Sequence, residues 1–569
     1  MHLRRTCTFF TSFTLFAVLA LGAACGGDSD ARPPDDAAVD LDGDAATGAD
    51  AGTDAAPFES DCVDDVSSVP GLVTTHEGNV QGVAEANGVW RFLGIPFAQP
   101  PVGDLRWRAP AAPGCLPEPV FVADTFGPAC PQLADGAVTG DEDCLQLNVW
   151  TPADYTADSK LPVLFFIHGG ANILGSASQG PLPGRPLYTG ESLAEAEGVV
   201  VVTVQYRLGP LGFLALPELS AESETGGSGH YAPLDHVAAL AWVQRNIARF
   251  GGDPERVLLF GQSAGAINVC TLLVSPRAAG LFSAALMQSG FCSGVPLADA
   301  EARFDAAVDV FDECRDASDR LACLRALPAE RIVGAIPGSI SELTYVPVID
   351  GHVLPDAPLA LLTRGEHNDV PFALGTTADE MASDNIFTLE VSTVEEYERL
   401  IEREFAEPEG TAARILELYP AEDFATPQEA LVRVYTDRAF TSGARRLARA
   451  AAASSRSPVY RYFFSKITES RAGAIPARHG IDLLYVFDVL TAIPVFTVTP
   501  ADAQVADAMG GSWAALARSG DPNATVLGAS WGAYDPSRDN YIDFGATVSA
   551  GAGLRSEACD FWDRLLEPR

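Results

Sequence analysis

A serine in the middle of this chain is flanked by small residues and lies between a strand-like run and a helix-like run. Residues 257–260 are apolar, and Gly261-Gln262-Ser263-Ala264-Gly265 follows them. Such a turn needs small neighbours, because bulky side chains would collide with the strand or with the helix. The start of the helix also directs backbone N–H groups toward a place where negative charge develops on an oxygen. The pattern predicts that Ser263 is a nucleophile; the alternative is a turn serine whose hydroxyl bonds to the backbone.

The segments around this turn alternate between buried strands and amphipathic helices. Residues 161–167 and 199–205 are unbroken apolar runs, and residues 234–250 carry apolar side chains at a helical period. Together they predict a large, mainly parallel sheet covered on both faces. Residues 71–92 instead look like short hairpin strands with Gly and Asn turns. Two further regions are helical and are expected to pack as a cap over the sheet, residues 300–330 and 395–450.

A serine nucleophile needs a base, and the chain contains eight histidines. His479 lies on a glycine-containing loop downstream of Ser263, in the chain order that this kind of turn requires. His168 begins a His-Gly-Gly-Ala run directly after a strand, where its neighbours offer backbone N–H donors. His479 is therefore predicted to be the base. The other histidines fall in the N-terminal segment, in polar turns or at a helix start: His2, His76, His230, His236, His352 and His367.

The acid that orients the histidine is expected at the end of a strand between Ser263 and His479. Residues 370–375 form a short strand-like run, and a polar loop with the adjacent carboxylates Asp379 and Glu380 follows it. Either carboxylate could accept the imidazole N–H, fix the tautomer and stabilise the imidazolium. The spacing alone does not choose between them.

Longer motifs run in order through the chain from about Gly71 to the C-terminus. They are Val80-Gln81-Gly82, residues 92–106, residues 142–150, residues 246–254 leading into the serine turn, and Gly520-Asp521-Pro522-Asn523. Together they resemble the type B carboxylesterase family, and within it the bacterial para-nitrobenzyl-type esterases. The resemblance implies an α/β-hydrolase fold: a large, mostly parallel central sheet with helices on both faces and helical cap insertions. It implies a serine carboxylic-ester hydrolase without a cofactor or a metal ion.

The resemblance also assigns roles to particular residues. It implies Ser263 as nucleophile, His479 as base and Glu380 as acid, the last by its place in a Gly-Thr-x-x-Asp-Glu motif. Catalysis would then proceed through an acyl-enzyme. Four further residues are implied: Gly170, Ala171 and Ala264 as the backbone donors of an oxyanion hole, and Ser289 as a supporting polar residue.

The sequence departs from the family pattern close to these residues. Gln262 stands where many members have Glu, Ala171-Asn172 replaces the commoner Gly-Phe, and Met381 replaces a Gly. None of these changes removes a predicted catalytic residue.

The N-terminus carries a processing signal. Arg4 and Arg5 precede the apolar stretch Phe9–Leu21, and Gly22-Ala23-Ala24 leads into Cys25. This arrangement resembles the bacterial lipoprotein signal, in which the cysteine is lipidated. Cleavage of an ordinary secretory signal and an uncleaved membrane anchor are the alternatives.

Residues 26–60 are rich in Gly, Ala, Pro and Asp. They hold nine Asp and one Glu against one Arg, and such a segment cannot bury enough apolar surface to offset its ordering entropy. The chain is therefore divided into a signal peptide (1–24), an acidic disordered tether (25–60) and a carboxylesterase domain (61–569). The protein is expected to be exported, lipid-anchored at a bacterial cell envelope or otherwise secreted or periplasmic.

Eleven cysteines are present, and nine remain when Cys7 and Cys25 are set aside. An exported chain can form disulfides, and an odd number leaves at least one thiol free or paired between chains. The family resemblance implies two disulfides, Cys130 with Cys144 and Cys314 with Cys323. It assigns no partner to Cys62, Cys115, Cys270, Cys292 or Cys559.

The formal net charge of −39 argues against binding to nucleic acid, which needs clustered Lys and Arg. The expected partner is a small-molecule ester, and a membrane is expected only through the lipid anchor. Two other functions compete with a carboxylesterase. One is a lipase or polyester hydrolase on the same scaffold, and the other is a catalytically silent adhesion or binding protein. The sequence predicts no oligomeric state.

Overall fold

The computed structural model describes residue 62 and residues 70–180, 185–340, 342–383, 387–525 and 527–566. The predicted signal peptide (1–24), the lipidation site Cys25 and the tether (25–60) lie outside these ranges. No helix within them is both long enough and apolar enough to cross a membrane.

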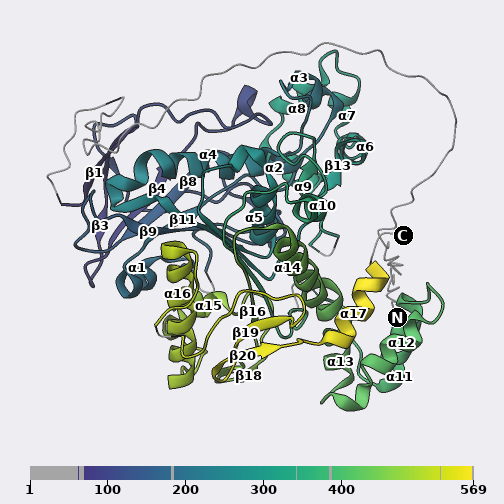
Figure 1. Ribbon diagram of the computed structural model, residues 1–569. Coiled ribbons are helices and arrows are strands. Elements are labelled where there is room, and N and C mark those ends of the chain that lie inside the picture. The colour runs from purple at the N-terminus through teal and green to yellow at the C-terminus, as the bar shows by residue number, and fades with distance from the viewer. Residues whose placement is uncertain are drawn as a thin grey trace, which may run out of the picture.

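A twisted sheet runs through the centre of the molecule (Figure 1). In the described part of the chain it has eleven strands in the order β20-β19-β16-β15-β12-β11-β9-β10-β8-β4-β3. The seven strands from β10 to β19 pair in parallel, and the strands beyond them at both edges pair antiparallel. The predicted mainly parallel sheet is therefore confirmed. Its strands are β3 (Val83–Ala84), β4 (Trp90–Pro96), β8 (Gln146–Thr151), β9 (Leu161–Ile167), β10 (Val200–Val204), β11 (Gly252–Gln262), β12 (Ala284–Gln288), β15 (Phe372–Thr377), β16 (Val459–Phe464), β19 (Asn540–Phe544) and β20 (Val548–Ala552).

Short strands lie outside the central sheet. The hairpin predicted near residue 71 is present as an antiparallel pair, β1 with β2. A second antiparallel pair, β6 with β7, lies within the segment between Cys130 and Cys144. The small strands are β1 (Leu72–Thr75), β2 (Gly78–Gln81), β5 (Phe121–Val122), β6 (Gln132–Ala134), β7 (Ala137–Thr139), β13 (Val295–Pro296), β14 (Val348–Ile349), β17 (Thr468–Ser470) and β18 (Gly473–Ile475).

Two hydrophobic cores cover the two faces of the sheet. Successive side chains of a strand point to opposite faces, and β9 shows this clearly. Val163, Phe165 and Ile167 pack into one core with α4 (Tyr231–Asn246) and α5 (Ala264–Val274). Leu164 and Phe166 pack into the other with α1 (Glu191–Glu197) and α16 (Pro500–Ser519). Burial on both faces explains why the parallel strands read as unbroken apolar runs.

The predicted helical regions are present. Near residues 300–330 lie α6 (Leu297–Val308), α7 (Asp312–Arg315), α8 (Arg320–Ala326) and α9 (Ala329–Ala335), and their apolar side chains join the first core. The region 395–450 behaves differently, because its first three helices form a separate lobe around Trp562 with α17. The fourth helix, α14, packs on the sheet against β15 and β16. The helices of this region are α11 (Val394–Glu404), α12 (Thr411–Leu418), α13 (Pro427–Thr436) and α14 (Ser442–Ser454). Helix α17 (Ser556–Leu566) comes from much later in the chain. The remaining α-helices are α2 (Gly209–Phe213), α3 (Pro217–Glu222), α10 (Pro358–Arg364) and α15 (Leu483–Val486).

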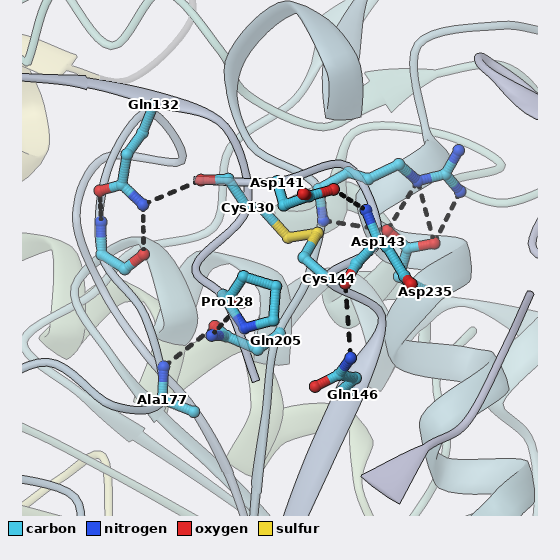
Figure 2. The surroundings of a disulfide bond; sticks show 12 residues. Pro128, Cys130, Gln132, Asp141, Asp143, Cys144, Gln146, Ala177, Gln205 and Asp235 are labelled. Carbon is cyan, nitrogen blue, oxygen red and sulfur yellow. Dashed lines mark hydrogen bonds and ion pairs between the residues drawn. A yellow bond between two sulfur atoms is a disulfide. The ribbon is translucent and has the colours of Figure 1, made fainter. Parts of the chain in front are cut away.

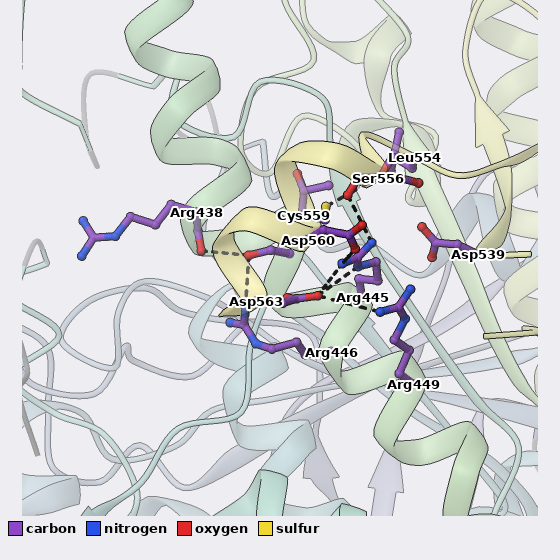
Figure 3. Close-up of polar contacts among 12 residues, drawn as sticks. Arg438, Arg445, Arg446, Arg449, Asp539, Leu554, Ser556, Cys559, Asp560 and Asp563 are labelled. Carbon is purple, nitrogen blue, oxygen red and sulfur yellow. Dashed lines mark hydrogen bonds and ion pairs between the residues drawn. The ribbon is translucent and has the colours of Figure 1, made fainter. Parts of the chain in front are cut away.

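Ion pairs join α14 to the C-terminal helix α17 (Figure 3). The Arg445 side chain is buried, with 1% of its surface exposed, and it contacts Asp560 at 2.6 Å and also Asp563. Arg446 Nη1 lies 3.0 Å from the second oxygen of Asp563. Asp563 therefore pairs with two arginines of α14. These ion pairs link α17, which belongs to the lobe, to a helix that packs on the sheet.

Replacing Asp563 with alanine is expected to destabilise the protein by about 2–3 kcal/mol. The change leaves the buried Arg445 guanidinium with the more exposed Asp560 as its acidic partner and with Ser556 O, so the loss should fall short of the ~3–5 kcal/mol typical of a fully buried pair. Urea unfolding measures the difference. Glu417→Ala is the control, because it removes the exposed contact with Arg414 at 2.8 Å and should have little effect. Equal stability of the two variants would show that the α14–α17 network does not secure the lobe.

Four disulfides are present among the described residues. Cys130–Cys144, shown in Figure 2, and Cys314–Cys323 confirm the pairs implied by the resemblance. Cys62–Cys115 and Cys270–Cys292 are pairs that the sequence left open. Cys559 remains a free, buried thiol on α17, and burial raises its pKa to about 12. It is the unpaired cysteine expected from the odd number.

Candidate active site

Ser263 lies in the turn between β11 and α5, where the sequence predicted it. Its backbone has φ 59° and ψ −124°, a conformation that costs a non-glycine residue about 1–3 kcal/mol. Its N–H donates to Gln288 O at 2.9 Å, and its carbonyl accepts from Ile267 N at 3.1 Å. The sheet and the helix thus hold the strained turn in place, and the side chain remains only half-buried.

The two glycines of the turn are required by close packing. A Cβ on Gly265 would lie 2.1 Å from the carbonyl oxygen of Ile167 at the end of β9, and a Cβ on Gly261 would lie 2.7 Å from the Gly265 carbonyl. No side chain fits at either place. The Gly-x-Ser-x-Gly spacing therefore follows from how tightly α5 crosses the end of the sheet.

His479 and Glu380 are brought together from separate loops. The Nδ1 atom of His479 lies 2.6 Å from Glu380 Oε2, and the Glu380 side chain is fully buried. The other carboxylate oxygen accepts from Thr377 N at 2.8 Å. Because a carboxylate can only accept a hydrogen bond, Nδ1 carries the imidazole proton and donates it to this bond, and the second nitrogen, Nε2, keeps its lone pair.

Asp379 points elsewhere, although it is adjacent to Glu380 in the chain. Its Oδ1 accepts a hydrogen bond from Arg433 Nη2 at 2.9 Å. The two carboxylates that spacing could not distinguish therefore have different partners: Glu380 contacts His479, and Asp379 contacts Arg433 on α13.

The Nε2 atom of His479 lies against the residue before Ser263. The Gln262 amide nitrogen is 3.1 Å from it and donates to its lone pair. Among the described residues there is no hydrogen bond between His479 and the Ser263 hydroxyl. Such catalytic contacts are often long in an enzyme without substrate and tighten when substrate binds. His479 is therefore held beside the turn, with its reactive nitrogen occupied by Gln262.

The segment His168–Gly175, called the glycine loop below, lies against the serine turn. A Cβ on Gly169 would be 2.9 Å from Ser263 Cβ, which shows that the two backbones are in contact. Gly170 and Ala171 both have positive φ, and among the described residues their N–H groups donate no hydrogen bond. Ala264 begins α5, and the first N–H groups of a helix have no partner within it. Backbone donors from two segments are thus available near Ser263.

His168 serves the structure of the glycine loop. It is fully buried, its ring stacks on Tyr206 with centroids 4.5 Å apart, and burial lowers its pKa to about 4. His236 lies near the same tyrosine and is also fully buried, so its pKa is lowered to about 3. His230 at the start of α4 is buried beside Asp350. The buried positions of His230 and His236 give both of them a packing role.

Ser289 follows β12 and lies beside the serine turn, because Gln288 and Gln262 are register partners. Its hydroxyl is buried without a partner among the described residues. Behind it lies Asp482, which accepts from Gln288 Nε2 at 2.8 Å. Burial is the main cause that raises the Asp482 pKa to about 6. Sequence reasoning did not single out Asp482, although its place three residues after His479 was a usable signal.

Two aromatic rings beside His479 were also missed. Phe440 lies on a π-helical turn, Asp437–Thr441, and its ring centroid is 5.3 Å from the imidazole. Phe291 meets Phe440 edge to face at 6.2 Å. Wide turns of this kind often occur at functional sites, but the sequence gives no sign of one. These rings give the site an apolar wall.

A model of the carboxylesterase family matches residues 70–562 of the chain. The fumonisin B1 esterase of Sphingopyxis macrogoltabida is 36% identical over 514 residues, covering 85% of this chain and 89% of that protein. The para-nitrobenzyl esterase of Bacillus subtilis (strain 168) is 34% identical, covering 81% of this chain and 92% of that protein.

Solved structures agree with these relatives. A thermophilic para-nitrobenzyl esterase has a TM-score of 0.73 at 30% identity, covering 87% of this chain and all of that chain. A Geobacillus stearothermophilus carboxylesterase has a TM-score of 0.73 at 33% identity, covering 86% of this chain and all of that chain. The fold of both spans nearly the whole described part of the protein.

Proposed function

Because the chain belongs to the carboxylesterase family, it is an enzyme that hydrolyses carboxylic esters, and we propose that it does so through an acyl-enzyme on Ser263. The 2.6 Å contact between Glu380 and His479, beside a serine on a strained turn, is the observation that carries the proposal. A base with an orienting acid next to a half-buried serine is the arrangement that activates a serine hydroxyl.

In the first half-reaction the Ser263 hydroxyl replaces the Gln262 amide as the donor to His479 Nε2. His479 takes the serine proton while the oxygen attacks the ester carbonyl. Glu380 stabilises the imidazolium that forms. The N–H groups of Gly170, Ala171 and Ala264 are the proposed donors to the oxyanion, and the loss of one such donor typically costs ~2.7–4 kcal/mol of barrier.

The tetrahedral intermediate collapses when His479 returns the proton to the leaving alcohol. A water molecule then takes the place of the alcohol, and His479 removes its proton as it attacks the acyl-enzyme. The second collapse releases the acid and restores the Ser263 hydroxyl. In both halves Ser289 is a proposed support behind the turn, since its buried hydroxyl lies beside the strand end that carries Ser263.

A fluorophosphonate probe tests the proposal directly. It reacts only with an activated serine, so one equivalent should attach to Ser263, as located by peptide mass spectrometry. His479→Ala should prevent labelling, whereas Asp379→Asn should not. Labelling of another serine, or none, would refute the assignment.

Replacing Gln262 with glutamate is expected to move the acid limb of the kcat/KM profile to higher pH by about one unit. A carboxylate at this place would stabilise the imidazolium of His479, and the base must be uncharged to accept the serine proton. Gln262→Met is the control, because it removes the amide without adding a charge. An acid limb at the same pH in the Glu and Met variants would contradict the proposed base.

We also propose that the protein is exported and anchored through Cys25. Four disulfides support an oxidising compartment. The signal and the cysteine that would carry the lipid are the sequence features that support the anchor.

A further inference from the structure

We propose that Gln132 is a positioning residue that holds the glycine loop in the shape needed to bind the oxyanion. The inference rests on the proposed function. It concerns a side chain on β6, within the loop closed by the Cys130–Cys144 disulfide, that touches neither Ser263 nor His479.

The Gln132 amide binds both backbone groups of one residue in the glycine loop (Figure 2). Gly175 N donates to Gln132 Oε1 at 2.8 Å, and Gln132 Nε2 donates to Gly175 O at 2.9 Å. The same Nε2 donates to Cys130 O at 3.1 Å. The Gln132 side chain is buried, so these bonds form away from solvent competition.

Gly175 transmits this contact to the serine turn. A Cβ at Gly175 would lie 2.6 Å from Gly169 O and 2.7 Å from His168 Nδ1, so its backbone packs directly on the start of the glycine loop. Gly169 in turn packs on Ser263. A continuous series of contacts therefore runs from Gln132 through Gly175 and Gly169 to the nucleophile.

The same two segments are joined a second time. Gln205 Oε1 accepts from Ala177 N at 3.0 Å, and its Nε2 donates to Pro128 O at 3.1 Å. Ala177 follows the glycine loop and Pro128 precedes the Cys130–Cys144 loop, so Gln205 links residues that flank these two loops. Gln132 is closer to the proposed oxyanion donors, because it binds Gly175, the residue that packs on the start of the glycine loop.

The far side of the glycine loop is fixed independently. Asn172 Nδ2 donates to Tyr345 O at 3.0 Å, and Asn172 Oδ1 accepts from Asn268 Nδ2 on α5 at 2.9 Å. Without Gln132 the loop would stay attached at Asn172 but lose its hold at Gly175. Oxyanion donors act only when their positions are preorganised, so this loss should affect the transition state more than substrate binding.

Gln132→Ala is expected to lower kcat for a short chromogenic ester by about 10- to 100-fold, less than the ~10²–10³ lost with a whole donor. KM should change little. Affinity for a trifluoromethyl ketone, whose hemiketal oxyanion occupies the same donors, should fall in parallel with kcat. Gln132→Glu keeps the acceptor for Gly175 N but loses both donor bonds, and it should also be impaired.

Gln244→Ala is the matched control. Its amide also donates to two backbone carbonyls, Pro254 O at 2.8 Å and Leu281 O at 3.0 Å, and it lies outside the site. It should lower the melting temperature but leave kcat and ketone affinity unchanged. Fluorophosphonate titration of each preparation corrects kcat for the fraction of active enzyme.

The inference is overturned if Gln132→Ala, after that correction, has the kcat and ketone affinity of Gln244→Ala. An unlabelled wild type with no esterase activity would instead overturn the proposed function, and this inference with it. A labelled and active wild type beside a fully active Gln132→Ala would overturn this inference alone.

Discussion

Ser263→Ala is expected to abolish ester hydrolysis, with a loss of about a million-fold in kcat and an intact fold. Alanine removes the oxygen that forms the acyl bond, and the methyl group fits the same half-buried turn. The change also leaves the backbone bonds to Gln288 and Ile267 in place. Turnover of a short chromogenic ester, together with circular dichroism and thermal unfolding, measures both parts of the expectation.

Ser275→Ala is the matched control, because Ser275 follows the other end of the same helix and its hydroxyl accepts a hydrogen bond from Arg277 N. It should hydrolyse the ester like the wild type. Wild-type turnover by folded Ser263→Ala would mean that another group carries the reaction.

Glu380→Gln is expected to reduce kcat by roughly ten-thousand-fold, the size seen when the acid of such a triad becomes an amide. The new side chain can still accept from Thr377 N, so its NH₂ group would face His479 Nδ1. That nitrogen must then become an acceptor, which places the imidazole proton on Nε2. The base would be in the wrong tautomer to take a proton from Ser263.

Asp379→Asn tests the neighbouring carboxylate under the same conditions. Its side chain can still accept from Arg433, so kcat should change little. If Asp379→Asn were as damaging as Glu380→Gln, the assignment of the acid would be wrong.

The local sequence was most informative where one short segment determines its own geometry. Gly261 and Gly265 predicted the serine turn, because only glycine fits against the end of β9. The apolar runs predicted the parallel strands, because a strand that is buried on both faces carries apolar side chains on both of them. His479 was readable from its chain order, because it lies on a glycine-containing loop downstream of Ser263.

Features that depend on contacts between distant segments were not readable. Asp379 and Glu380 differ only in which way each side chain points, and Arg433 on a remote helix attracts the first. Gln132 bonds to a backbone 43 residues away in the chain, a contact that has no sequence signature. The π-helical turn that places Phe440 beside His479 likewise has no signature in the sequence.

The proposed acyl-enzyme is most directly tested by trapping it. Rapid mixing with an ester that deacylates slowly, followed by acid quench and peptide mass spectrometry, should reveal one acyl group on Ser263. The released alcohol should appear in a burst equal to the amount of active enzyme. Alcohol release without a burst, and with no acyl group on the Ser263 peptide, would contradict covalent catalysis by this serine.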